Sequence, residues 1–258
     1  MGVLNLTPDS FSDGGRYGTP DDAVARASVM VDEGADIIDV GGESTRPGAE
    51  EIPADQEIDR TAAVIERIAT LGVPISIDTR KAVVAKAALD AGARIVNDVS
   101  GGLHDPAMLP LVADRRVPIV LMHMRGTPET MDAEARYTDV VTDVRRELSA
   151  RVTAAKHAGV DESAILVDPG LGFAKTAEQS LELVRRVDEL GSLGCPIVVG
   201  PSRKRFVGHV LGTEADDRLE GSLAVCAWCA MNGVAVVRVH DVKETRRVVD
   251  MVGAIRDA

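Results

Sequence analysis

Aromatic residues are scarce in this chain of 258 residues: they make up 2% of it, as three Phe, two Tyr and one Trp. The core must therefore be aliphatic, and the stacking platforms that bind single-stranded nucleic acid are missing. Basic residues are also outnumbered, with 29 Lys and Arg against 41 Asp and Glu, for a formal net charge of −12. Such a chain repels phosphate backbones and anionic membranes. We therefore expect no nucleic acid and no membrane as partner.

Cysteine is rare too, with only Cys195, Cys226 and Cys229. The C-x-x-C spacing of the last two can mark redox or metal chemistry. They stand in an apolar run, however, where this spacing places both on one helix face, and we interpret them as buried structural thiols. Neither a secreted disulfide framework nor a signal peptide nor an apolar run of transmembrane length is visible. The sequence thus predicts a cytoplasmic protein.

Short apolar runs alternate with longer amphipathic stretches along the whole chain. The expected strands are 3–6, 36–40, 74–78, 94–97, 118–122, 164–167, 196–199 and 234–237. The expected helices are 21–33, 55–71, 81–91, 106–114, 139–157, 178–190, 218–232 and 242–255. The strands are continuously apolar, as in a parallel sheet covered on both faces. Eight such units predict an α/β fold, a (β/α)8 TIM barrel forming a single domain over residues 1–258. A doubly wound sheet is the alternative, but no G-x-G-x-x-G follows the first strand.

Every predicted strand ends in a polar group, and a parallel barrel places all these ends on one face, where catalysis occurs. The groups are Asn5, Asp39, Asp78, Asn97, His123, Asp168, the basic cluster 202–205, and Arg238 with His240. A single Asp or Asn at such a place could simply cap the next helix. Eight polar ends in register predict an active site instead.

The chemistry of these groups suggests two subsites. Asp78, Asn97 and Asp168 are short, rigid acceptors that suit a heterocycle with several N–H donors. Arg238 and His240 follow the last strand, next to Asn5 of the first, where this fold often binds phosphate. The amide oxygen of Asn5 suits Mg²⁺, which takes few protein ligands. An ion pair of Arg238 with Asp241 or a similar carboxylate is the structural alternative.

Three further features leave alternatives open. Lys204 lies in the basic cluster, which a solvated surface loop would also explain; a Schiff-base lysine is disfavoured because it follows the strand in a loop. His123 is expected to have a structural or rim hydrogen-bonding role. With only five His in the chain, we do not expect a three-His metal site. Loops 7–18 and 41–53 are rich in Gly, Ser, Thr and Asp, as active-site lids are. Arg46 could meet a substrate carboxylate there, although an ordinary Pro-Gly turn explains the loop as well.

These residues stand in motifs that resemble those of dihydropteroate synthases across essentially the whole chain. The motifs are N-L-T-P-D-S-F-S-D-G-G at 5–15, D-V-G-G-E-S-T-R-P-G at 39–48, I-D-T at 77–79, N-D-V-S-G-G at 97–102, M-H at 122–123, D-P-G-L-G-F-A-K-T at 168–176, S-R-K-R-F at 202–206 and R-V-H-D at 238–241. The resemblance implies a TIM-barrel transferase of folate biosynthesis that joins (7,8-dihydropterin-6-yl)methyl diphosphate to 4-aminobenzoate. It also implies Mg²⁺ as cofactor and a homodimer, for which helix 223–231 is a candidate interface, although a core-facing helix explains that stretch nearly as well.

The resemblance assigns roles residue by residue. Asn5 would bind Mg²⁺, and the catalytic residues would be Asp78, Lys204, Arg238 and His240. The pterin would be held by Asp78, Asn97, Asp168 and Lys204, and the diphosphate by Arg238 and His240. The 4-aminobenzoate pocket, which sulfonamides occupy in the family, would be formed or bordered by Thr45, Arg46, Pro47, Phe173 and Ser202. Met122 and Val239 complete the expected substrate-binding set.

No covalent nucleophile is expected, because the chain has no Ser-His-Asp or Cys-His constellation and diphosphate is a good leaving group. Two other functions remain open at this point: methyl transfer from methyltetrahydrofolate to a corrinoid protein, and pterin binding without turnover. Replacement of Arg238 by Ala is expected to reduce turnover far more than stability. Phe11 or Asp13 is a candidate to reach the substrate when loop 7–18 closes.

Overall fold

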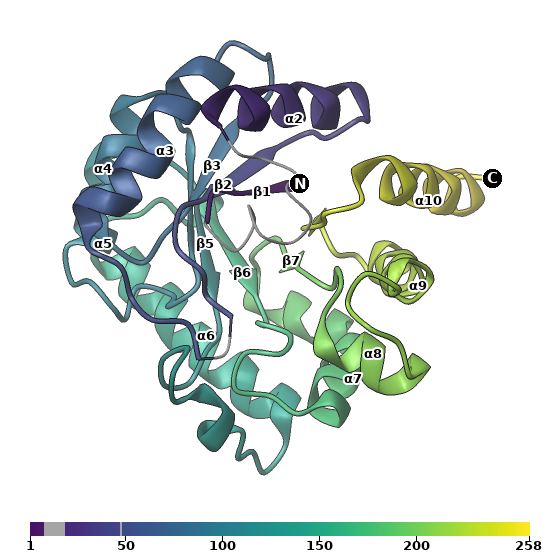
Figure 1. The fold of residues 1–258 in the computed structure, drawn as a ribbon. Helices are drawn as coiled ribbons and strands as arrows, with labels where there is room; N and C mark the ends of the chain where they lie inside the picture. The colour runs from purple at the N-terminus through teal and green to yellow at the C-terminus, as the bar shows by residue number, and fades with distance from the viewer. Residues whose placement is uncertain (8–18, 47) are drawn as a thin grey trace.

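The computed structural model of this protein describes residues 1–7, 19–46 and 48–258. Parallel strands alternate with helices, and Figure 1 shows the strands in the middle of the molecule with helices around them. The strands are β1 (Gly2–Asn5), β2 (Ile38–Gly41), β3 (Ile75–Asp78), β4 (Ile95–Asp98), β5 (Ile119–Met122), β6 (Ile165–Asp168), β7 (Val198–Val199) and β8 (Val236–Val237). Val and Ile dominate them because branched side chains pack well on a pleated sheet.

The strands close into a barrel. β1 to β6 form one sheet in chain order, and β7 pairs with β8. Parallel bridges join Val167 of β6 to Ile197 and Gly2 of β1 to Val239. The last junction is a pair of hydrogen bonds, in which Val3 N donates to Val239 O at 2.9 Å and Val239 N to Met1 O at 2.9 Å. The predicted (β/α)8 barrel is therefore confirmed.

Helices connect the strands on the outside of the barrel. They are α2 (Pro20–Asp32), α3 (Ala54–Ile68), α4 (Ala82–Asp90), α5 (Met108–Arg115), α6 (Val140–His157), α7 (Ala177–Arg185), α8 (Arg205–Leu211), α9 (Leu219–Met231) and α10 (Val242–Arg256). The sequence determines where α7 begins, because the side chains of Thr176 and Gln179 form a capping box that satisfies free backbone N–H groups at the start of the helix. The order of strands and helices thus follows the prediction closely.

Two helices differ from the sequence prediction. The expected helix 178–190 is α-helical only to Arg185 and continues as a 3₁₀ helix, Val187–Leu193, which Gly194 ends at φ 72°. The short helix α8 was not predicted, because its seven residues include Gly208, a poor helix former. A Cβ on Gly208 would lie 2.4 Å from the Arg218 guanidinium, so the close approach of α8 to that side chain needs glycine.

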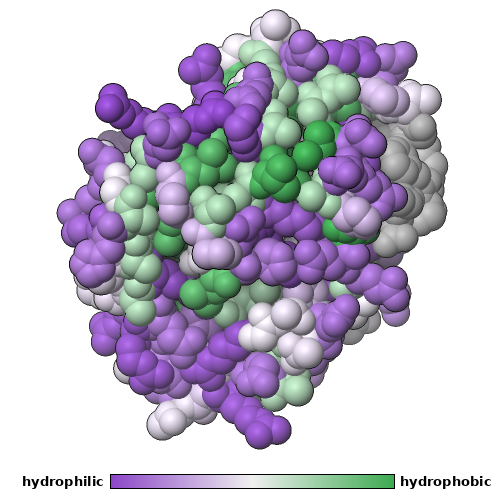
Figure 2. All heavy atoms as spheres, turned by 90° about the vertical axis from the view of Figure 1, so that its left-hand side faces the viewer, coloured by the Kyte–Doolittle hydropathy of each residue, from purple (hydrophilic) through white to green (hydrophobic). Residues whose placement is uncertain are grey.

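The core lies between the strands and the inner faces of the helices, and it is aliphatic, as the scarcity of aromatics predicts. Cys195, Cys226 and Cys229 are buried and free, which confirms their structural reading. Figure 2 shows the flank of α3, α4 and α5, where hydrophilic side chains dominate and apolar ones appear in scattered groups. Within the described ranges, no helix combines the length and apolar composition needed to cross a membrane.

Candidate active site

The predicted polar row lies across four neighbouring strands. In the pairing register Asn5 stands opposite Gly41, Gly41 opposite Asp78, and Asp78 opposite Asn97. A Cβ on Gly41 would lie 3.6 Å from both Asn5 Oδ1 and Asp78 Cβ, so this glycine leaves room between them. Since these are the carboxyl ends of parallel strands, the row lies on the face where barrels place their active sites.

Arg238 joins the last strand to this row through two carboxylates. Its Nε donates to Asp39 Oδ2 at 2.6 Å and its Nη2 to Asp78 Oδ2 at 2.7 Å. Asn97 Nδ2 also donates to Asp39 Oδ2, at 3.1 Å. The side chain of Asp39 is fully buried, and that of Asp78 nearly so. Arg238 therefore has the carboxylate partners that the structural alternative envisaged, but they come from β2 and β3 rather than from Asp241.

The electrostatics of this cluster are dominated by burial. Burial raises the pKa of Asp78 to about 7, although the charge of Arg238 acts in the opposite direction. Burial also opposes the charge of Arg238, but Asp39 and Asp78 outweigh it and raise the pKa of the guanidinium. Asp39 Oδ1 and Asp78 Oδ1 are buried and have no hydrogen-bond partner among the described residues. Buried unpaired carboxylate oxygens are costly, so such atoms mark places where a ligand or water supplies donors.

Lys204 is at the opposite side of the acceptor cluster and is not a solvated surface residue. Its Nζ donates to Leu171 O at 2.9 Å and lies 4.2 Å from the centre of the Phe173 ring. Burial lowers its pKa to about 8, while the nearby Asp168 and Asp78 carboxylates act to raise it. Asp168 accepts from Gly170 N at 2.7 Å, and burial raises the pKa of this carboxyl group as well. The predicted residues Asp78, Asp168, Phe173 and Lys204 are thus brought together.

His240 and Ser202 form a second polar group on the loops that follow β8 and β7. His240 Nδ1 lies 3.0 Å from Ser202 Oγ, which also accepts from His240 N at 3.2 Å. Burial lowers the pKa of His240 to about 3, helped by the positive charges of Arg238, Arg203 and Arg46. His240 is therefore neutral at pH 7 and can meet an anion as a hydrogen-bond donor. Asp241, the suspected partner of Arg238, pairs with Arg203 at 2.5 Å.

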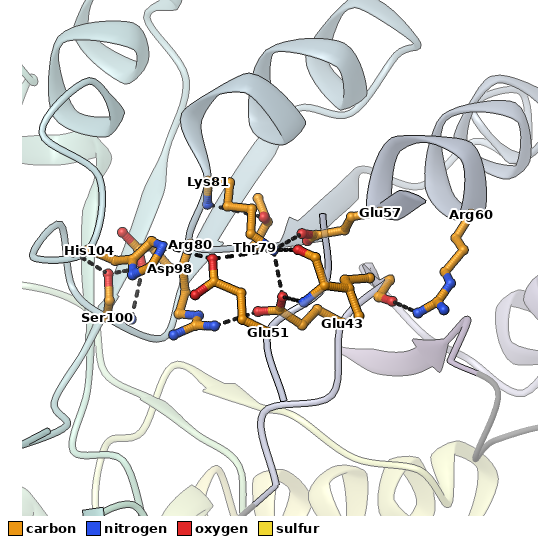
Figure 3. A network of polar contacts seen from close by, with 12 residues as sticks. Glu43, Glu51, Glu57, Arg60, Thr79, Arg80, Lys81, Asp98, Ser100 and His104 are labelled. Carbon is orange, nitrogen blue, oxygen red and sulfur yellow. Dashed lines mark hydrogen bonds and ion pairs between the residues drawn. The ribbon is translucent and has the colours of Figure 1, made fainter. Parts of the chain in front are cut away.

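The base of loop 41–53 is held by an ion-pair network, which Figure 3 shows from close by. Glu43 accepts from Arg80 Nη2 at 2.6 Å and from Lys81 Nζ at 2.5 Å. Lys81 Nζ also donates to Glu57 at 2.9 Å and to Ile52 O at 2.8 Å, and Ile52 N donates back to Glu43 at 3.0 Å. Residues 43 and 52 are therefore joined, and the segment between them, with Thr45 and Arg46, forms a loop with a fixed base.

The other predicted residues are placed as follows. Met122 is buried in a small apolar cluster against which Phe173 packs. The side chain of Val239 lies in the core, and its backbone N–H and C=O both bond to β1. Thr45 is half-buried and Arg46 exposed. Pro47, and Phe11 and Asp13 of the predicted lid 7–18, lie outside the described residues.

Sequence reasoning missed the contribution of four residues to this site. Asp39 was recognised as a strand end, but its bonds to Arg238 and Asn97 were not foreseen; a lone Asp inside an apolar strand is the signal that could have shown it. Arg80 and Lys81 read as the start of a helix, although two adjacent cations after a strand also suggest carboxylate partners. Lys175 lies in the D-P-G-L-G-F-A-K-T motif, and its complete burial had no signal in the sequence.

Comparisons with known proteins point to one family. The model for "Pterin binding enzyme" matches residues 1–240. A probable bifunctional folylpolyglutamate synthase/dihydropteroate synthase of Haloferax volcanii is 52% identical over 257 residues, which span 100% of this chain and 30% of that protein. The dihydropteroate synthase of Bacillus subtilis is 48% identical over 256 residues, covering 99% of this chain and 87% of the relative. The structure of Yersinia pestis dihydropteroate synthase with a sulfonamide drug has a TM-score of 0.96 at 41% identity, covering 100% of this chain and 94% of the other.

Proposed function

This chain belongs to the dihydropteroate synthases among the pterin-binding enzymes, transferases of folate biosynthesis, and we propose that its site divides their reaction among three groups of residues. The reaction joins (7,8-dihydropterin-6-yl)methyl diphosphate to 4-aminobenzoate and gives 7,8-dihydropteroate and diphosphate. The family that the motifs predicted is thereby confirmed. The roles of individual residues, the metal and the oligomeric state are proposals that the geometry supports.

The pterin is proposed to bind the acceptor cluster at the ends of β3, β4 and β6, next to Asp39 of β2. The observation that carries this proposal is the pair of buried carboxylate oxygens without partners, Asp39 Oδ1 and Asp78 Oδ1. Asn97 adds an amide oxygen, because its Nδ2 is already bonded to Asp39. Lys204 and Asp168 complete the ring of polar groups. A pterin has N–H donors for the carboxylates and a carbonyl for the lysine, so it satisfies both kinds of group.

The diphosphate is proposed to lie beside Asn5, Arg238, Ser202 and His240. Asn5 supplies one neutral oxygen, and no cluster of three or more His, Cys, Asp and Glu side chains suited to an ion occurs in residues 1–7, 19–46 and 48–258. This single protein oxygen fits Mg²⁺, which keeps several waters and is usually held by few protein ligands together with substrate phosphates. When bound, the ion would offset the charge of the leaving diphosphate. Neutral His240 and cationic Arg238 would donate hydrogen bonds to the diphosphate.

The 4-aminobenzoate is proposed to lie between the loop with Thr45 and Arg46 and the wall formed by Phe173, Met122 and Ser202. The bond from the pterin methylene carbon to diphosphate oxygen breaks, and diphosphate leaves with the electron pair. The amine nitrogen then bonds to that carbon and loses a proton. The buried carboxylates stabilise the cationic methylene by charge, so no covalent enzyme intermediate is needed.

A diphosphate-release assay tests this function. Purified protein with Mg²⁺ and both substrates should release diphosphate and form dihydropteroate, and omission of 4-aminobenzoate should suppress product formation. A sulfonamide should compete with 4-aminobenzoate, as the drug bound to the Yersinia pestis relative suggests. Binding of the pterin diphosphate without turnover would instead identify a non-catalytic paralogue. Methyl transfer from methyltetrahydrofolate to a corrinoid protein would support the other function that the sequence left open.

A homodimer through α9 and α10 is also proposed. The two helices lie side by side (Figure 1), and both expose large apolar side chains. These are Trp228, Met231, Met251 and Ile255, of which Met231 is 68% exposed and Ile255 66%. A two-fold interface would bury this surface against its own copy. Location in the cytoplasm and the lack of a nucleic-acid or membrane partner remain predictions from composition.

A further inference from the structure

Lys175 has a buried amino group that contacts no carboxylate among residues 1–7, 19–46 and 48–258. It lies on the loop between β6 and α7 and is 4% exposed. Its Nζ donates to Phe173 O at 2.8 Å and to His123 O at 3.3 Å, and it lies 3.0 Å from His123 Nδ1. Three acceptors therefore match its three N–H bonds. Burial lowers the pKa of this amino group well below its ordinary value, which reflects how costly it is to keep it in the interior beside neutral partners. A function has to explain that cost.

His123 connects this lysine to α6. Its Nε2 lies 2.9 Å from Glu147 Oε2. Hydrogen bonds from His123 and Arg125 hold the pKa of Glu147 well below its ordinary value, so this carboxylate accepts. The ring proton of His123 is therefore on Nε2, and Nδ1 accepts from Lys175. Glu147 is held in turn by Arg125, whose Nη2 donates to it at 2.5 Å and whose guanidinium lies 4.0 Å from the centre of the Tyr137 ring. The lysine is therefore attached to a continuous chain of hydrogen bonds.

The loop that Lys175 holds is unusually constrained. Ala174, directly between Phe173 and Lys175, is fully buried and has φ 51°, in the left-handed region that disfavours side chains. A Cβ on Gly170 would lie 2.0 Å from His123 O, so the loop is pressed against the end of β5. Such a conformation persists only where surrounding bonds enforce it. The bonds from Lys175 to Phe173 O and His123 O do so here.

This constraint bears directly on the active site. The same loop places the Phe173 ring 4.2 Å from Lys204 Nζ and supplies Leu171 O as acceptor for that ammonium at 2.9 Å. We propose that Lys175, through His123 and Glu147, is a positioning residue that fixes Phe173 as the wall of the 4-aminobenzoate pocket. This inference rests on the proposed function. It assigns Lys175 no contact with either substrate.

Replacement of Lys175 by Met keeps the aliphatic volume and removes all three donors. The KM for 4-aminobenzoate should rise roughly tenfold, which corresponds to about 1.4 kcal/mol, within the range for hydrogen bonds to a charged group. The KM for the pterin diphosphate should change less than twofold, because Lys175 bonds to Phe173 O and His123 O rather than to Leu171 O, which holds Lys204. Lys175→Arg, which retains the charge and donors, should restore part of the affinity for 4-aminobenzoate.

Thr176→Ala is the matched control. It removes the capping box of α7 one residue further along, lowers the Tm, and leaves the bonds of Lys175 in place. If it raises the KM for 4-aminobenzoate as much as Lys175→Met does, general loosening explains the effect and the proposal is wrong. Equal KM changes for both substrates in Lys175→Met would overturn it as well. If Lys175→Met does not fold, Glu147→Gln should raise the KM for 4-aminobenzoate by a smaller factor and leave the KM for the pterin diphosphate nearly unchanged. Equal changes, or no change, in the two KM values of Glu147→Gln would count against the proposal.

A second readout does not depend on turnover. The chain has three Phe, so fluorophenylalanine labelling gives three ¹⁹F resonances, and Phe173→Leu identifies the one of Phe173. Lys175→Met should shift or broaden that resonance, whereas Thr176→Ala should leave it in place. An unchanged Phe173 resonance would refute the positioning role. If Lys175→Met shows the ¹⁹F effect but the wild-type protein releases no diphosphate, the proposed function fails and the structural part of the inference stands.

Discussion

Asp78 has a pKa near 7 even though it forms an ion pair with Arg238, because burial opposes its charge more strongly than one cation supports it. The raised pKa of Asp78 makes the free energy of unfolding depend on pH in a definite direction. Between about pH 4, where an ordinary Asp titrates, and pH 7 the folded chain holds a proton that the unfolded chain releases. The contribution of Asp78 to stability is therefore present below about pH 4 and is lost as the pH rises towards 7. Function at neutral pH thus comes at the expense of stability.

We expect kcat/KM for the pterin diphosphate to follow a bell-shaped pH profile. Activity should rise as Asp78 loses its proton near pH 7 and fall as Lys204 loses its own near pH 8. Lys204→Arg should move the alkaline fall to higher pH, since Arg stays protonated. Because the diphosphate also ionises, the affinity for a hydroxymethylpterin without phosphate should be measured in parallel. A flat affinity between pH 6 and 9 would contradict the assignment.

Arg238→Ala should abolish turnover and also destabilise the protein, which differs from the expectation drawn from the sequence alone. The substitution leaves buried Asp39 and Asp78 without their cation, and breaking a buried pair costs about 3 kcal/mol. The Tm loss should be greater at pH 8 than at pH 5, because Asp78, whose pKa burial raises to about 7, can take up a proton at pH 5.

Arg203→Ala is the control for stability, since it removes another Arg–Asp pair that is more exposed and costs less than about 1 kcal/mol. Thermal unfolding of the wild type, Arg238→Ala and Arg203→Ala at pH 5 and pH 8 measures the difference in Tm. A Tm of Arg238→Ala equal to that of Arg203→Ala would show that the buried pairs contribute little.

Loop 41–53 is an element whose base is rigid although its composition resembles that of a lid. Glu43→Gln should weaken the bonds to Arg80 and Lys81, free the segment that carries Arg46, and raise cleavage by endoproteinase Glu-C at the exposed Glu50 of that segment several-fold. The KM for 4-aminobenzoate should rise with it. Glu51→Gln is the matched control, because Glu51 is half exposed and 3.8 Å from Lys81. Equal cleavage of both variants and wild type would exclude a role of the network in holding the loop.

At the level of the whole molecule, the exposed apolar surface on α9 and α10 predicts self-association. Met231→Glu combined with Met251→Glu should convert a dimer into a monomer, measured by light scattering after size-exclusion chromatography. Leu103→Glu, at a residue that is 69% exposed in the loop before α5, should leave the mass unchanged. A wild-type mass of one chain at micromolar concentration would disprove the dimer.

The barrel and the polar face could be predicted because their signals are local. A continuous apolar run of four or five residues that alternates with longer amphipathic stretches predicts a strand, and the residue that follows it stands at the carboxyl end. Asp78, Asn97 and Asp168 were found in this way. Helix α8 could not be found, because it is short, contains Gly208 and is stabilised by contacts with Arg218 rather than by its own propensity. The base of loop 41–53 could not be predicted for a similar reason, since its charged side chains come from three separate segments: Glu43 after β2, Glu57 in α3, and Arg80 with Lys81 after β3.

The sequence by itself determined the order of elements, the face of the site and the family, since strand periodicity and motif spacing are properties of the chain. Only the tertiary structure decided which charges meet. Arg238 and Asp39 are 199 residues apart, and Lys175 and His123 are 52 apart. Closure of the barrel brings the first pair together, and packing of the β6–α7 loop on β5 brings the second. Their pKa values and hydrogen bonds depend on burial that no local pattern encodes, because desolvation is a property of the folded interior.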